Sequence, residues 1–171
     1  MKNKLIIGII ALAMFALSAG MVAAKANFSG VWTLDGSKSE GLPPGMTQTM
    51  NVTQNGDRLE VEITLKAEQG EARTVKDAFV LDGKETDFTP PLVGGTDTTV
   101  KKAKRTSKWT KDEKGFESTE EAVLTAPDGG ENTIKAKRQW SLSSDGKTLT
   151  IEVSMQNPNG DSKSKRVFVK K

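Results

Sequence analysis

The sequence contains no cysteine, no histidine and no tyrosine among its 171 residues. These absences exclude a disulfide, a Ser-His-Asp triad, a Cys-His dyad and a zinc site built from imidazole or thiolate ligands. The groups left for chemistry are carboxylates, lysines and hydroxyls, and none of them stands in a recognisable catalytic motif. We therefore expect a protein that is not an enzyme, with no catalytic residue, no metal site and no cofactor.

Long apolar runs are also scarce, and the one that exists lies at the N-terminus. Residues 1–4 are basic, residues 5–17 are apolar apart from one glycine, and small residues follow. This pattern predicts a cleaved secretory leader, and the run is short for a membrane-spanning helix of about 20 residues, although an uncleaved anchor is the alternative. Cleavage after Ala24 and cleavage after Ala26 both fit; residues 1–26 are taken as the signal peptide. The mature chain is then exported, either periplasmic or secreted.

An excess of charge is missing as well. The full chain carries a net charge of +3, and the three lysines within residues 1–26 account for all of it. A neutral mature chain does not indicate a nucleic-acid partner. Stable membrane insertion is not expected either, because an outer-membrane barrel needs aromatic girdles, whereas this chain has no tyrosine and only three tryptophans.

Strand-like alternation, by contrast, fills residues 27–171. Residues 58–68 and 147–156 place apolar side chains at every second position, and Gly turns such as Asn55-Gly56 and Asp82-Gly83 separate the segments. The pattern predicts one all-β domain over residues 27–171, an antiparallel up-and-down barrel of eight to ten strands, since closure removes exposed edges. An open or two-sheet sandwich is the alternative.

The first strand carries a recognisable motif, Phe28-Ser-Gly-Val-Trp-Thr-Leu34. It resembles the Gly-x-Trp signature of the calycins, which comprise lipocalin, fatty-acid-binding and avidin-like barrels. The resemblance implies a lipocalin-like fold in which Gly30 permits tight entry into the strand and Trp32 plugs one barrel end. It also implies that a basic residue on a late strand, here Arg166, packs over that tryptophan. The stretch 138–151 is similar to exported bacterial lipocalin-like proteins of unknown function, so no ligand is carried over.

The basic stretch 100–108 precedes an acidic one. If Trp109 lies opposite Phe116 across a turn, basic and acidic residues fall on directly opposed positions of two strands. The pairs are then Lys104–Glu121, Arg105–Glu120 and Lys108–Glu117. Such cross-strand pairs contribute about 0.2 to 1 kcal/mol each, so this stretch is expected to be neutralised within the protein.

The same register places arginines on the apolar face. Our hypothesis is that Arg105 and Arg138 reach into a cavity and hold the carboxylate or phosphate of an amphiphile. The apolar lining residues are then Trp109, Phe116, Trp140 and Met50. The alternative is that Arg105 pairs permanently with Glu120 and that Arg138 lies at the rim with its head in water.

Three functions follow from these observations. The first is an exported, non-catalytic binding protein for a small hydrophobic or amphiphilic ligand. The second is a protein-interaction or structural module of the cell envelope, with a filled core. The third is an envelope hydrolase that uses two converging carboxylates, such as Asp77 and Glu120. A cavity of some hundreds of Å³ is the feature that distinguishes the first from the second.

Overall fold

The computed structural model describes residues 25–91 and 99–171, which form ten β-strands and one short 3-10 helix. The strands are β1 (Gly30–Leu34), β2 (Thr47–Asn55), β3 (Arg58–Lys66), β4 (Arg73–Val80), β5 (Asp82–Asp87), β6 (Thr99–Trp109), β7 (Gly115–Thr125), β8 (Glu131–Leu142), β9 (Thr148–Asn157) and β10 (Gly160–Lys170). The helix η1 (Gly36–Lys38) follows β1. In these two ranges no helix has the length and apolar character needed to cross a membrane. Residues 1–24, most of the expected leader, lie outside the described part of the chain.

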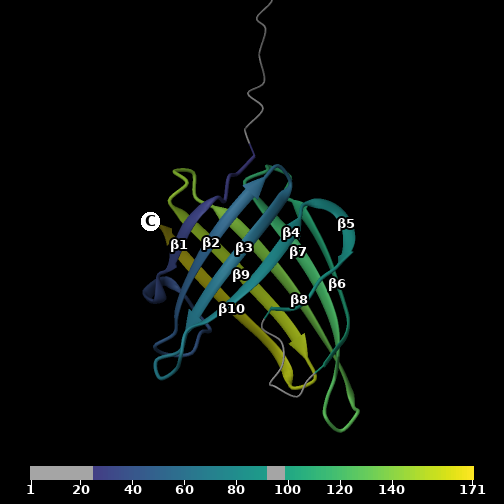
Figure 1. Ribbon diagram of the computed structural model, residues 1–171. Helices are drawn as coiled ribbons and strands as arrows, with labels where there is room; N and C mark the ends of the chain where they lie inside the picture. Colours follow the sequence, from purple (N-terminus) through teal and green to yellow (C-terminus); the bar gives the residue numbers. More distant parts are fainter. Residues whose placement is uncertain (1–24, 92–98) are drawn as a thin grey trace, which may run out of the picture.

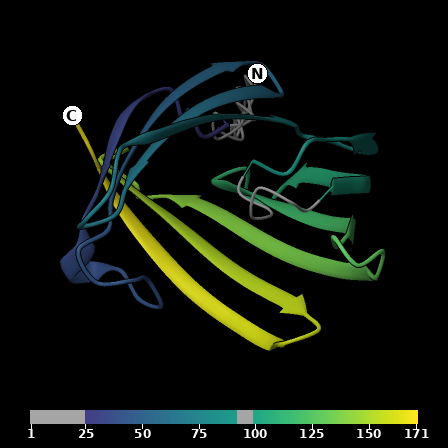
Figure 2. The ribbon, with the colours of Figure 1, turned by 60° about the horizontal axis from the view of Figure 1, so that its bottom comes forward.

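The strands make one antiparallel sheet that curls into a nearly closed barrel (Figure 1). Their order in space is β4-β3-β2-β1-β10-β9-β8-β7-β6-β5, so the first and last strands of the chain pair with each other. Seen from the end, β1–β4 form one wall and β7–β9 the opposing wall (Figure 2). This confirms the all-β, up-and-down, lipocalin-like barrel of eight to ten strands.

One expected hairpin is absent from the described sheet. β4 and β5 follow each other in the chain but form the two edges of the sheet, which we call the seam. The Asp82-Gly83 turn was expected to pair its flanking strands, and that expectation was wrong. A two-residue type I′ hairpin needs positive φ at both central residues, whereas only Gly83 has it, at +75°. The chain therefore bends across the seam, and β5 pairs with β6 through a bulge between Asp82 and Glu85.

The interior is divided along the barrel axis. One half, at the end where residues 25–29 and the β6–β7 turn lie, is filled with aromatic side chains, and we call it the closed end. Phe116 lies 5.0 Å from Trp140 and 5.5 Å from Phe28 between ring centres, and Phe79 lies 5.6 Å from Trp140. These four side chains are at most 3 % exposed. Burial of this apolar surface is the main stabilising contribution to a chain without disulfides.

The register of β6 against β7 is the one that the charge pattern predicted. Trp109 lies opposite Phe116, and the three basic residues lie opposite the three expected glutamates. On the outer face, the ion pairs differ from those that the register suggested: Lys104 reaches Asp87 at 2.8 Å, and Glu117 pairs with Lys137 of β8 at 3.6 Å. Of the three expected pairs, only Arg105 and Glu120 form an ion pair among the described residues.

Candidate functional site: an arginine-lined cavity

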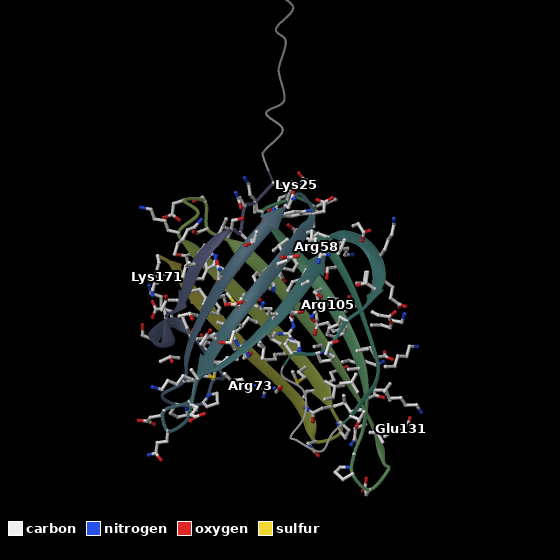
Figure 3. All side chains as sticks on the ribbon, viewed as in Figure 1. Lys25, Arg58, Arg73, Arg105, Glu131 and Lys171 are labelled. Atoms are coloured by element: carbon white, nitrogen blue, oxygen red, sulfur yellow. The ribbon has the colours of Figure 1, made fainter. Side chains whose placement is uncertain are left out.

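A layer of buried ions lies directly against the aromatic half of the barrel. It contains Asp77 of β4, Arg105 of β6, Glu120 of β7 and Arg138 of β8, all on inward-facing positions of their strands. The Arg105 side chain is 2 % exposed, and those of Asp77 and Glu120 are each 7 % exposed. Figure 3 shows Arg105 midway between Lys25 at the closed end and Glu131 at the far end. We call these four residues the ionic layer.

Arg105 has its hydrogen-bonding capacity taken up by the protein. It donates to both oxygens of Asp77, at 2.7 and 3.0 Å, and to the carbonyl of Ala78 at 2.6 Å. It also donates from Nε to Glu120 Oε1 at 3.1 Å. Two rings cover its guanidinium, with Phe79 at 4.2 Å and Phe88 at 4.1 Å from ring centre to Cζ. This geometry makes Arg105 a structural clasp across the seam rather than a group that is available to a ligand.

Arg138 is less fully engaged. Its Nε donates to Glu120 Oε1 at 3.0 Å, and that oxygen also accepts from Arg105. The Arg138 side chain is 19 % exposed, so part of its guanidinium remains accessible beyond the ionic layer. One carboxylate oxygen thus serves two guanidinium groups.

Arg166 of β10 lies on the inner face beside this layer without an ionic partner. No described carboxylate forms a salt bridge with it, and its buried Nε has no acceptor among the described residues. Burial lowers the pKa of Arg166, and the nearby positive charge of Arg138 lowers it further. The two arginines stand on the strands that flank β9, since Arg138 pairs with Val153 and Arg166 with Ile151. The ionic layer is neutral, with two arginines and two carboxylates, so the addition of Arg166 leaves one positive charge in excess.

An inner cavity of about 260 Å³ opens between these arginines and the far end of the barrel. Its residues on β7–β10 are on inward-facing positions except Lys163, and the segment after β5 covers them. Its polar lining includes Glu120, Arg138, Ser162, Ser164 and Arg166, and its apolar lining includes Phe88, Pro90, Pro91, Ile134, Val153 and Met155. A compartment that is cationic at one end and apolar elsewhere is complementary to an anion with an apolar body.

The structure separates the residues that the sequence grouped as a ligand site. Met50, Phe116 and Trp140 are between 0 and 3 % exposed within the aromatic half. Trp109 lies at the closed end, where its Nε1 donates to Asp57 at 2.8 Å. None of these four borders the inner cavity, which Arg138 alone of the expected ligand-binding set lines.

The Gly-x-Trp motif lies at the closed end, but a different cation covers its tryptophan. Lys170 Nζ lies 5.2 Å from the centre of the Trp32 ring, a place that the sequence had assigned to Arg166. Gly30 has φ of +139°, and a Cβ there would come within 2.6 Å of Lys170 Cε. Trp32 is fully buried, and its Nε1 donates to the carbonyl of Phe28 at 2.8 Å. Gly30 therefore leaves the space through which Lys170 reaches the ring.

Two larger hollows of about 490 and 540 Å³ lie on the outer surface. Most of their lining side chains are on outward-facing strand positions, and they are charged or hydroxylic. Lys137, for example, lines the first hollow and is already paired with Glu117. Such solvated ion pairs contribute little binding energy, so the smaller inner cavity is the better candidate. In the described ranges no group of three or more carboxylates is placed to hold a metal ion.

Sequence reasoning missed two parts of this site. It placed Arg166 over Trp32 at the closed end, and its set of ligand-binding residues did not include Phe88, Pro90 and Pro91. The inward direction of Arg166 was expected, since it shares a strand face with Phe168, but its position along the barrel axis was not.

No family model matches the chain, and no curated protein matches it. Among solved structures, the chain is similar to the zebrafish ileal bile acid-binding protein complexed with cholic acid, at 19 % identity and a TM-score of 0.49, over 84 % of this chain and 98 % of that one. It is also similar to a secretory abundant heat soluble protein from Ramazzottius varieornatus, at 13 % identity and a TM-score of 0.46, over 86 % and 98 % of the two chains. At these values the likeness transfers no ligand to this protein.

Proposed function

We propose that this protein binds a small amphiphilic molecule with a single negative charge, without catalysing a reaction on it. The observation that carries the proposal is Arg166, a largely buried guanidinium without an acidic partner among the described residues, in the wall of an otherwise mainly apolar cavity. A desolvated cation is costly unless an anion compensates it. A bound carboxylate between Arg166 and Arg138 supplies that anion and brings the interior to neutrality.

The cavity volume limits the size of the ligand. At about 30 Å³ per non-hydrogen atom, the volume of a water molecule in the liquid, 260 Å³ holds about nine such atoms. Two of these atoms are the carboxylate oxygens, so the volume corresponds to a carboxylic acid with about seven carbons. We therefore expect a medium-chain or small aromatic acid, its apolar part packed on Ile134, Val153 and Met155.

The carboxylates inside the barrel support binding rather than catalysis. A hydrolase built on Asp77 and Glu120 needs one of them free to act as an acid, a base or a nucleophile. Both instead accept hydrogen bonds from Arg105. Their role in the proposal is structural, since they hold the clasp that closes the seam.

Export is the second part of the proposal. The leader over residues 1–26 supports a periplasmic or secreted protein. No cysteine is present, so the fold does not depend on the oxidising conditions that such compartments provide.

Isothermal titration calorimetry with octanoate, octylamine and octanol tests the ligand class. We expect octanoate to bind most tightly, and Arg166→Met to weaken its binding by about tenfold or more, because a hydrogen bond to a charged group contributes about 1.5–3 kcal/mol. Lys165→Met, one residue away on the opposite face of β10, is the matched control and leaves binding unchanged. Equal binding of the three probes, or binding unaffected by Arg166→Met, contradicts the proposal.

The same titration also tests the alternative function, a protein-interaction module of the cell envelope with a filled core. The aromatic half of the barrel is packed as that alternative requires, and two large apolar side chains in the described chain are exposed, Val31 at 42 % and Val169 at 39 %. No binding of any probe, together with an unmodified native mass for the exported protein, favours the interaction module over the binding protein.

A further inference from the structure

The first described residues are built into the closed end of the barrel. Ala26 is 8 % exposed; its N–H donates to the carbonyl of Glu113 at 2.8 Å, and its own carbonyl accepts from Gln54 Nε2 at 3.1 Å. The same Gln54 side chain accepts from the N–H of Phe28 at 2.8 Å. One amide from β2 therefore holds the chain on both sides of residue 27, and Phe28 is inserted into the aromatic core.

Lys25 continues this docking at the surface. Its Nζ lies 3.0 Å from Asp57 and 3.7 Å from Glu113, and 5.2 Å from the centre of the Trp109 ring. Asp57 accepts from both Lys25 and Trp109, and these two hydrogen bonds lower its pKa. The partners come from the β2–β3 turn, the end of β6 and the β6–β7 turn. Three separate elements thus present groups complementary to Lys25.

The two possible cleavage points of the leader have different structural consequences. Cleavage after Ala26 removes Lys25 and Ala26, and with them the donor to the Glu113 carbonyl and one hydrogen bond of Gln54. It also leaves Asp57 without its lysine. Cleavage after Ala24 keeps all of these contacts, and Val22 and Ala24 supply the small residues that the peptidase requires.

We infer that the processing site lies between Ala24 and Lys25, so that the mature protein begins with Lys25-Ala26 as part of the barrel end. This inference rests on the proposed export and moves the boundary of the signal peptide from residue 26 to residue 24. Residues of a discarded leader have no reason to match groups on three elements of the mature fold, whereas a mature N-terminus does. Lys25 and Ala26 are therefore the first residues of the folded domain.

The test is the intact mass and N-terminal sequence of the protein recovered from the exported fraction of cells that express the full chain. A chain that begins Lys-Ala-Asn-Phe supports the inference. A chain that begins Asn-Phe-Ser-Gly overturns it while leaving export standing, and an uncleaved chain overturns both. As a second variant, Val22→Lys alters the third residue before the Ala24 cleavage point alone, and we expect it to deplete the Lys25 form. If the amount of protein that begins at Lys25 is the same in that variant, the signal peptidase does not cleave between Ala24 and Lys25, and the inference is contradicted.

Discussion

Arg105 and Asp77 form a two-pronged ion pair, at 2.7 and 3.0 Å, between β6 and β4 at a seam where the edges of the sheet do not pair. The guanidinium also donates to the backbone carbonyl of Ala78 on β4. A carbonyl on the edge strand β4 therefore accepts a hydrogen bond from a side chain. Elsewhere in the barrel, such carbonyls accept from the backbone of a neighbouring strand. The absence of a β4–β5 ladder and the presence of buried charge are two parts of the same arrangement.

Removal of the Arg105 clasp is expected to destabilise the protein strongly. Arg105→Met leaves Asp77 and Glu120 buried without their shared cation, a change that costs about 3–5 kcal/mol in comparable cases. Urea denaturation measures the free energy of unfolding. The control is Lys137→Met, whose exposed pair with Glu117 contributes less than about 1 kcal/mol. Equal losses in the two variants contradict the role of Arg105 as the clasp.

Arg166→Met is expected to weaken octanoate binding without a loss of folding stability. Burial and the positive charge of Arg138 lower the pKa of Arg166, which means that its charged form is disfavoured in the unliganded fold. Replacement by an apolar side chain removes this cost, so we expect the free energy of unfolding to stay the same or to rise by about 1 kcal/mol. Octanoate binding falls in the same variant. A loss of stability comparable to that of Arg105→Met identifies Arg166 as a structural residue instead.

The contrast between these two arginines shows what the sequence could predict. Strand alternation and a local turn fixed the pairing of β6 with β7, and therefore placed Arg105 opposite Glu120. Both residues lie within one hairpin, where turn length sets the register. The third partner, Asp77 of β4, was named only as a carboxylate that converges with Glu120, and its ion pair with Arg105 depends on how the whole sheet closes. That closure depends on strand number and shear, which no local pattern contains.

The cavity was beyond prediction for the same reason. Met50, Phe116 and Trp140 were expected to line it because they share the apolar face with the arginines, but a barrel interior has a length as well as a face. The position of a residue along the axis decides whether it meets other aromatic rings or open space. Arg166 was assigned to the Trp32 ring by family resemblance, although Lys170, four residues later on the same face, is the residue at that height.

Stability is expected to be nearly constant between pH 5 and pH 8 and to decrease below about pH 4. The chain has no histidine, so no side chain has an ordinary pKa between pH 5 and pH 8. Hydrogen bonds lower the pKa of several aspartates from the ordinary value of 3.8; for Asp145, the largest cause is the Ser143 hydroxyl and the next is the Lys147 N–H. A carboxyl group whose folded pKa is lowered contributes stability that is present above its unfolded pKa and is lost as the pH falls through the folded pKa.

Urea midpoints measured from pH 2 to pH 8 check this profile. We expect the acid decrease to be smaller in Asp145→Asn, because that variant has lost the titrating group. A step in stability between pH 5.5 and pH 7.5 contradicts the assignment of the pH dependence to these aspartates.

Phe28 tests whether the segment before β1 belongs to the core. Its ring is fully buried and contacts the rings of Trp109, Phe116 and Trp140, with centres 5.5 to 6.2 Å apart. Phe28→Ala removes the ring and leaves a cavity among these three rings, while the backbone carbonyl that accepts from the Trp32 indole is retained. We expect a loss of about 3–5 kcal/mol in the free energy of unfolding.

Val31→Ala is the matched control for Phe28→Ala, since Val31 is only three residues away but 42 % exposed. We expect its effect to stay within about 0.5 kcal/mol. The aromatic signal in near-ultraviolet circular dichroism gives a second readout, because loss of Phe28 loosens the packing around both Trp109 and Trp140. If Phe28→Ala leaves this signal and the unfolding midpoint unchanged, the N-terminal segment is an appendage to the barrel. If both fall, the segment is part of the core, and the aromatic half of the barrel depends on residues that precede the first strand.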